Sequence, residues 1–121
     1  MKFQEMDRHV TYAEQIGSHD GPIKLVNLFT MDTDDVEGFL RVWSEDAAFM
    51  KRQPGYIRAQ LHRGTAGSAT FINIATWESA EALRVAFTAP EFQQTLTNYP
   101  ESVEASPHVF VEVAVPGICT A

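Results

Sequence analysis

The chain has 121 residues, of which 45% are hydrophobic, and a formal net charge of −7 at pH 7. This length fits one globular domain, and an acidic chain without a basic cluster disfavours nucleic acid as a partner. With one cysteine, no signal-peptide core and no apolar run near the ~20 residues of a membrane span, we expect a cytoplasmic protein that does not contact a membrane.

Residues 1–22 are rich in polar side chains and end in the loop-forming sequence Gly-Ser-His-Asp-Gly-Pro. We interpret them as an N-terminal extension, either a mobile arm or a flap over a neighbour. The predicted single domain covers residues 23–121 and opens with a strand at 23–31. Apolar residues occupy both faces of this strand, and Asn27 interrupts one of them.

A helix is expected to follow the strand. Asp32, Thr33 and the next two aspartates suit its N-terminus, and Pro54-Gly55 ends it. Its apolar stripe has spacings of three and four residues and comprises Val36, Phe39, Leu40, Trp43, Ala47 and Met50.

The second half of the chain contains three more expected strands. Residues 56–63 and 69–77 are predicted to pair across a turn at 64–68. Ser79 is expected to cap a helix at 80–87, and Thr88-Ala89-Pro90-Glu91 resembles a capping box that begins a helix ending near Asn98. The last strand is predicted at 107–115, before an apolar tail.

The order β-α-β-β-α-β predicts an α+β, ferredoxin-like fold, with a four-stranded antiparallel sheet and helices on one face. The strands at 23–31 and 69–77 are apolar on both faces, so one layer of helices leaves an apolar sheet face uncovered. We therefore predict a homodimer formed through the open sheet face, with the tail at 115–121 reaching toward the partner.

The strand at 69–77 contains the most informative polar group. Phe71, Asn73, Ala75 and Trp77 alternate with Ile72 and Ile74, so Asn73 and Trp77 share one face. Burying an amide among apolar residues is costly unless it is hydrogen-bonded. Either a protein group or a ligand is therefore expected to satisfy Asn73.

The sequence offers no arrangement for a metal or an organic cofactor, and we expect neither. The four histidines, His9, His19, His62 and His108, are scattered along the chain, without the clustered spacing of a metal site. No glycine-rich dinucleotide or phosphate loop is present. His62, near the end of a strand, is interpreted as an exposed rim residue or as a proton shuttle at a pocket mouth.

Three segments together resemble the antibiotic biosynthesis monooxygenase superfamily. They are Pro54-Gly55-Tyr56-Ile57, Leu61-His62 and the stretch from Phe71 to Ala82, which contains Trp77-Glu78-Ser79. The likeness covers about residues 23–115, and within the superfamily it is nearest to the quinol monooxygenase of the actinorhodin pathway. Such proteins form dimeric α+β barrels.

The resemblance implies oxidation of an anthrone- or hydroquinone-like polyketide by dioxygen, without metal or flavin, because the substrate supplies the electrons. It implies Asn73 and Trp77 as catalytic residues that bind a developing oxyanion and a flat ring. Substrate contacts are predicted from Asn27, Phe29, Tyr56, His62 and Phe87.

Two departures from the superfamily's pattern leave alternatives open. Leu83 occupies the position of a tyrosine, which Tyr56, Tyr99 or His62 would have to replace. The heme-degrading branch uses a strand-one asparagine, matched by Asn27, but its axial histidine falls on Leu96, which disfavours heme degradation. A non-catalytic dimeric binding or stress protein, or a cyclase or isomerase on the same barrel, are the other hypotheses.

Overall fold

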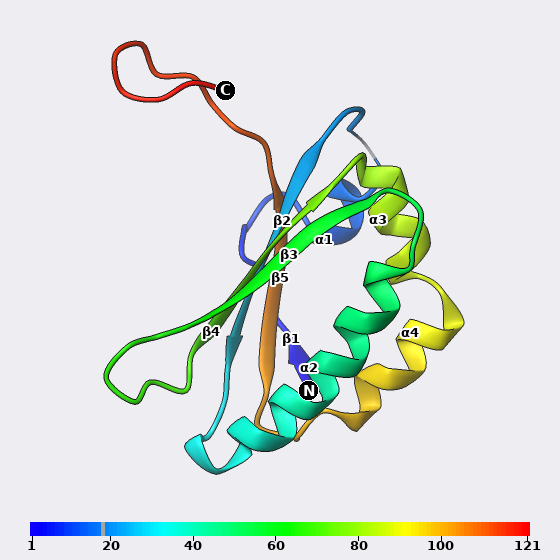
Figure 1. Cartoon of the computed structure of the whole chain (residues 1–121), viewed down its shortest axis with the longest axis vertical. Coiled ribbons are helices and arrows are strands. Elements are labelled where there is room, and N and C mark those ends of the chain that lie inside the picture. The colour runs from blue at the N-terminus through cyan, green and yellow to red at the C-terminus, as the bar shows by residue number, and fades with distance from the viewer. Residues whose placement is uncertain (18) are drawn as a thin grey trace.

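The computed structural model describes residues 1–17 and 19–121 (Figure 1). One sheet carries the strands in the order β1-β5-β2-β4-β3. The elements are β1 (Lys2–Phe3), α1 (Tyr12–Gln15), β2 (Ile23–Thr30), the 3-10 turn η1 (Thr33–Asp35), α2 (Val36–Lys51), β3 (Tyr56–Arg63), β4 (Phe71–Trp77), α3 (Ala80–Phe87), α4 (Pro90–Thr95), the 3-10 turn η2 (Leu96–Asn98) and β5 (Glu104–Phe110).

The α+β, ferredoxin-like prediction is confirmed, but the sheet has five strands where four were expected. Strands β2, β3, β4 and β5 pair antiparallel, and β1 adds a short parallel strand beside β5 through the pairs Lys2–Glu104 and Phe3–Ala105. Two residues are too few to show an alternating pattern, so no local pattern predicted β1.

Helices α2, α3 and α4 lie together on one side of the sheet (Figure 1). The side chains of Val26, Leu28, Ile72 and Ile74 occupy alternate positions to the buried ones and face the other side. These four side chains form an apolar patch on that face, and no described element of the chain covers it fully, since Ile74 keeps 38% of its surface exposed.

The N-terminal segment packs on the same sheet. Beyond β1, the side chain of Gln15 in α1 bonds the backbone of Val109 in β5, with its amide nitrogen 3.0 Å from the carbonyl and its amide oxygen 2.9 Å from the N–H. Gln15 thereby occupies the edge of β5 where β1 has ended. Pro107, with no N–H, is tolerated on this free edge.

Residues from two of the three segments that carry the resemblance contact each other. The N–H of Glu78 donates to the carbonyl of Gly55 over 2.8 Å. Gly55 has a φ of +86° and a side chain there would meet Cβ of Ala82 at 2.4 Å, so only glycine fits. Ser79 caps α3 as predicted, because its hydroxyl accepts from the N–H of Ala82. These contacts fix where β4 ends and α3 begins.

The first long helix begins where the aspartates predicted it, since Asp32 and Asp35 are the N-caps of η1 and α2, although neither makes a side-chain cap hydrogen bond. Two other predicted element ends were wrong. Thr88 does not open a capping box, because its hydroxyl donates back to the carbonyl of Arg84 at the end of α3, and Ala89 is the N-cap of α4. The last strand was predicted at 107–115, but it begins at Glu104 and ends at Phe110. Pairing with β2 covers these residues and outweighs the weak strand propensity of the segment.

The C-terminal segment leaves the body of the fold after β5 (Figure 1). Its apolar side chains are exposed, with Val113 at 67% and Ile118 at 82%. A backbone bridge between Val115 and Cys119 closes a turn within it. In the described part of the chain no helix is both long and apolar enough to cross a membrane.

Candidate functional site

A polar pair interrupts the buried face of the sheet. The pairs between β2 and β4 that face the helices are Ile23–Trp77, Leu25–Ala75, Asn27–Asn73 and Phe29–Phe71. The first two belong to one buried apolar cluster and the last to a second. Asn27 and Asn73 therefore sit opposite each other at the boundary between two halves of the core.

Neither carboxamide is satisfied by the protein. The Oδ1 atoms of Asn27 and Asn73 are buried, and no described residue makes a hydrogen bond with them. A buried polar group without a partner costs roughly 1–3 kcal/mol. The sequence left two explanations open for Asn73, a protein partner or a ligand. No described residue is the protein partner.

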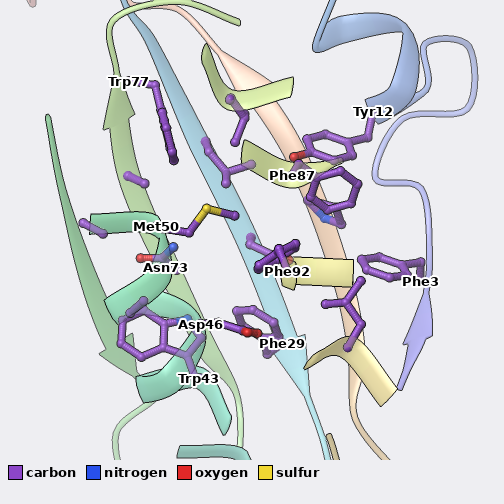
Figure 2. Close-up of a pocket in the computed structure, with 18 of the residues that line it drawn as sticks. Phe3, Tyr12, Phe29, Trp43, Asp46, Met50, Asn73, Trp77, Phe87 and Phe92 are labelled. Carbon is purple, nitrogen blue, oxygen red and sulfur yellow. The ribbon is translucent and has the colours of Figure 1, made fainter. Parts of the chain in front are cut away.

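A pocket lies over this pair, between the sheet and the helices (Figure 2). Its empty space, with its opening to solvent included, is about 710 Å³. Apolar and aromatic side chains dominate the lining, which comprises Met1, Phe3, Tyr12, Leu25, Asn27, Phe29, Trp43, Asp46, Ala47, Met50, Tyr56, Ala59, Asn73, Ala75, Trp77, Leu83, Phe87, Phe92, Leu96, Tyr99 and Pro107.

Six of the seven predicted site residues line this pocket: Asn27, Phe29, Tyr56, Asn73, Trp77 and Phe87. Trp77 is 1% exposed, and the ring of Tyr56 packs edge-on against it with 5.5 Å between centroids. Figure 2 shows Trp77 and Asn73 on the same side of the cavity. The structure thus brings these residues together, and their roles stay predictions.

His62 does not reach the pocket. It pairs with Ile72, and Ile72 pairs with Leu28, so its side chain stands on the open face of the sheet. The prediction that His62 contacts the substrate at a pocket mouth placed it on the wrong face, because a strand turns alternate residues to opposite sides. No histidine is among the described residues that line the pocket.

Asp46 is the functional candidate that the sequence reasoning missed. It lies on α2, is 5% exposed, and lines the pocket. Its carboxylate accepts hydrogen bonds from the hydroxyls of Thr95 and Tyr99, the latter over 2.6 Å. A signal was available, since Asp46 is three residues after Trp43 and four before Met50, on the apolar stripe of the helix.

Burial sets the ionisation of this network. It raises the pKa of the Asp46 carboxyl above its ordinary value, and the two hydroxyl donors oppose that effect. Burial, and then the neighbouring Asp46 charge, raises the pKa of Tyr99, which therefore stays a neutral hydrogen-bond donor. A carboxyl with a raised pKa beside an apolar pocket is a stronger base than an exposed one and is suited to proton transfer.

Leu83 and Leu96, the two positions where the chain departs from the superfamily's pattern, both line the pocket with apolar surface. In the described part of the chain no three histidine, cysteine or acidic side chains gather as a metal site requires. The chemistry available here is therefore that of carboxamides, hydroxyls, one carboxyl and aromatic rings.

Residues 22–98 match the family model described as antibiotic biosynthesis monooxygenase. The chain belongs to the antibiotic biosynthesis monooxygenase family. This membership confirms the resemblance seen in the sequence and assigns the chain to a family of oxygenases.

Relatives of this family member agree with that assignment. It is 37% identical over 70 residues to deoxynogalonate monooxygenase of Streptomyces nogalater, and the match spans 58% of each chain. It superposes on SnoaB, a cofactor-independent oxygenase from the same organism, with a TM-score of 0.72 and 28% identity, over 80% of this chain and 98% of SnoaB. Rv0793 from Mycobacterium tuberculosis, at 12% identity and a TM-score of 0.67, shares the fold over 79% of this chain and 99% of its own.

Proposed function

We propose that this protein is a cofactor-independent monooxygenase that oxidises an anthrone- or hydroquinone-like aromatic compound with dioxygen. The observation that carries the proposal is the Asn27–Asn73 pair, whose carboxamides lack described protein partners in an apolar pocket. The description of SnoaB as a cofactor-independent oxygenase supports it.

The chemistry needs only the substrate and oxygen. Loss of a proton from the substrate yields an electron-rich anion, which passes one electron to dioxygen. The resulting carbon radical and superoxide combine, and the hydroperoxide loses water to leave a carbonyl. The sum is RH₂ + O₂ → R=O + H₂O, in which the substrate carbon is oxidised and oxygen is reduced.

The carboxamides of Asn27 and Asn73 are placed to stabilise that anion. A carboxamide N–H directed at a developing oxyanion in a water-poor site is worth about 10²-fold or more in rate. The unpartnered atoms are the two carboxamide oxygens, which accept a hydrogen bond from a substrate hydroxyl, and the same side chains carry the N–H donors that an oxyanion needs. Trp77 and Phe29 supply flat apolar surface on either side of the pair, which suits a planar aromatic substrate.

Asp46 is our candidate for the group that takes the first proton. It is the one acidic side chain among the described residues that line the pocket. Its raised pKa brings it nearer to that of a phenolic or benzylic acid, which favours proton transfer. The Thr95 and Tyr99 hydroxyls hold its carboxylate in place.

The homodimer expected from the sequence remains part of this proposal. The apolar open face carries Val26, Leu28, Ile72 and Ile74, and Phe110 beside it is 41% exposed. A second copy that packs face to face would cover it, as in sheet sandwiches. The C-terminal segment follows Phe110 directly in the chain, and its exposed apolar side chains extend the surface available to the interface.

The purified protein, treated with a chelator, should consume oxygen above the spontaneous rate when given an anthrone or a dihydroquinone. Asn73→Ala should lower kcat by about 10²-fold. If Asp46 takes the proton, kcat of the wild type rises with pH as its carboxyl ionises, and Asp46→Asn should remove this rise. Asn98→Ala, an exposed residue of η2, is the matched control. Binding without oxygen uptake in the wild type would refute the enzymatic proposal and favour the non-catalytic binding protein.

A further inference from the structure

The N-terminal segment, residues 1–17, forms one wall of the pocket although it lies outside the region that matches the family, residues 22–98. It contributes Met1, Phe3 and Tyr12 to the lining. In Figure 2, Phe3 and Tyr12 stand on the opposite side of the cavity from Asn73 and Trp77.

Tyr12 is held firmly in this wall. Its backbone N–H donates to the Glu5 carboxylate over 2.9 Å, and α1 is anchored by the two bonds between Gln15 and the backbone of Val109. The ring of Tyr12 packs edge-to-face on Phe87, with 5.1 Å between centroids. These contacts fix the ring, and none of them uses the hydroxyl.

The hydroxyl of Tyr12 is buried and unpartnered. The residue is 6% exposed, and no described group makes a hydrogen bond with its oxygen. In Figure 2 this oxygen points into the cavity. Phenylalanine would supply the same ring without the cost of roughly 1–3 kcal/mol for an unsatisfied polar group. The hydroxyl is therefore explained by a ligand rather than by the fold.

We propose that Tyr12 donates a hydrogen bond to a second oxygen of the substrate, remote from the oxygen at the Asn27–Asn73 pair. α1 is anchored on the edge of β5 that faces away from β2, and the Tyr12 hydroxyl faces the cavity from the wall opposite Asn73. The substrate class that reaches both walls is a fused-ring aromatic with hydroxyl or carbonyl oxygens at both ends. This inference rests on the proposed function for the aromatic nature of the ligand.

Two probes that are stable in air test the inference by binding alone. They are 2,6-dihydroxyanthraquinone, with a hydroxyl at each end, and 2-hydroxyanthraquinone, with one. The wild type should bind the first about 5- to 10-fold more tightly, the equivalent of one hydrogen bond. Tyr12→Phe should bind the two with equal affinity, as measured by quenching of tryptophan fluorescence. A wild type without this preference, or a Tyr12→Phe variant that keeps it, overturns the inference.

Stability provides a second readout. Tyr12→Phe should be at least as stable as the wild type, since it removes an unpartnered hydroxyl. Tyr99→Phe, which loses a bond to Asp46, should be less stable and is the matched control. If Tyr12→Phe is destabilised as much as Tyr99→Phe, the hydroxyl is structural and the inference fails. Oxygen uptake is measured separately. If probe binding depends on Tyr12 but the protein consumes no oxygen, only the oxygenase proposal is refuted. If the protein consumes oxygen but Tyr12→Phe has the same probe preference as the wild type, only the role of Tyr12 is refuted.

Discussion

Asn27 and Asn73 are direct partners across β2 and β4, and their buried carboxamide oxygens make no hydrogen bond to a described residue. Apolar pairs lie on both sides of them along the same face of the sheet. A core that served stability alone would continue the apolar pattern at this position. The pair therefore makes the fold less stable than an apolar pair would, which is common at binding sites.

Replacing Asn73 by leucine should therefore stabilise the protein. Asn73→Leu keeps the branching and the number of side-chain heavy atoms and removes an unpartnered amide oxygen, so the free energy of unfolding should rise by about 1 kcal/mol or more. Urea unfolding measures it, and Asn98→Leu at an exposed position should change stability by less than about 0.5 kcal/mol. A loss of stability in Asn73→Leu would mean that the amide has a structural partner.

The pH dependence of stability should report on Asp46. Burial raises the pKa of the Asp46 carboxyl in the folded state above its ordinary value of 3.8, so the folded protein binds this proton more tightly than the unfolded chain. The stabilising contribution is complete below about pH 3.8 and is lost as pH rises through the folded-state pKa. The free energy of unfolding of the wild type should therefore fall relative to that of Asp46→Asn as pH increases above 3.8.

Urea unfolding of both proteins between pH 4 and pH 8 would show this difference. Tyr99→Phe removes a hydrogen bond to the charged carboxylate, so it should move the pKa of Asp46 higher still and shift the fall to higher pH. Parallel curves for wild type and Asp46→Asn would show that the carboxyl titrates as it does in the unfolded chain.

The open face of the sheet should control the oligomeric state. Ile74→Asp places a charge in the middle of this face, and in a twofold dimer the two charges would face each other's apolar surface. We expect a monomer by analytical ultracentrifugation. Val85→Asp is the control, because Val85 is 54% exposed on α3 rather than on the sheet. A dimer that survives Ile74→Asp would place the interface elsewhere.

Local patterns predicted most of the elements correctly because local physics governs them. The residues of Phe71–Trp77 alternate as a strand requires, and the apolar residues of α2 recur every three or four positions as a helix requires. The hydroxyl of Ser79 caps α3 by accepting from an N–H three residues later. The error at Thr88 has a different origin. A threonine three residues before a glutamate suits an N-cap, but in this chain α3 extends to Phe87, so Thr88 lies at its C-terminal end.

The candidate site was predicted partly from strand parity and partly from the family resemblance. Asn73 and Trp77 share a face whatever the rest of the fold does, and the resemblance added Asn27, Phe29, Tyr56 and Phe87. Parity also explains the misplaced His62, which the pairing of β3 with β4 turns toward the open face.

The sequence by itself determined the α+β order of elements and the shared face of Asn73 and Trp77, because both follow from periodicities of a few residues. Only the tertiary structure decided that Asn27 lies opposite Asn73, that Asp46 on α2 is buried beside Tyr99, and that Tyr12 reaches the pocket from outside the family match. Whether a polar atom is satisfied depends on neighbours far away in the chain, and pairing and packing alone bring those neighbours together.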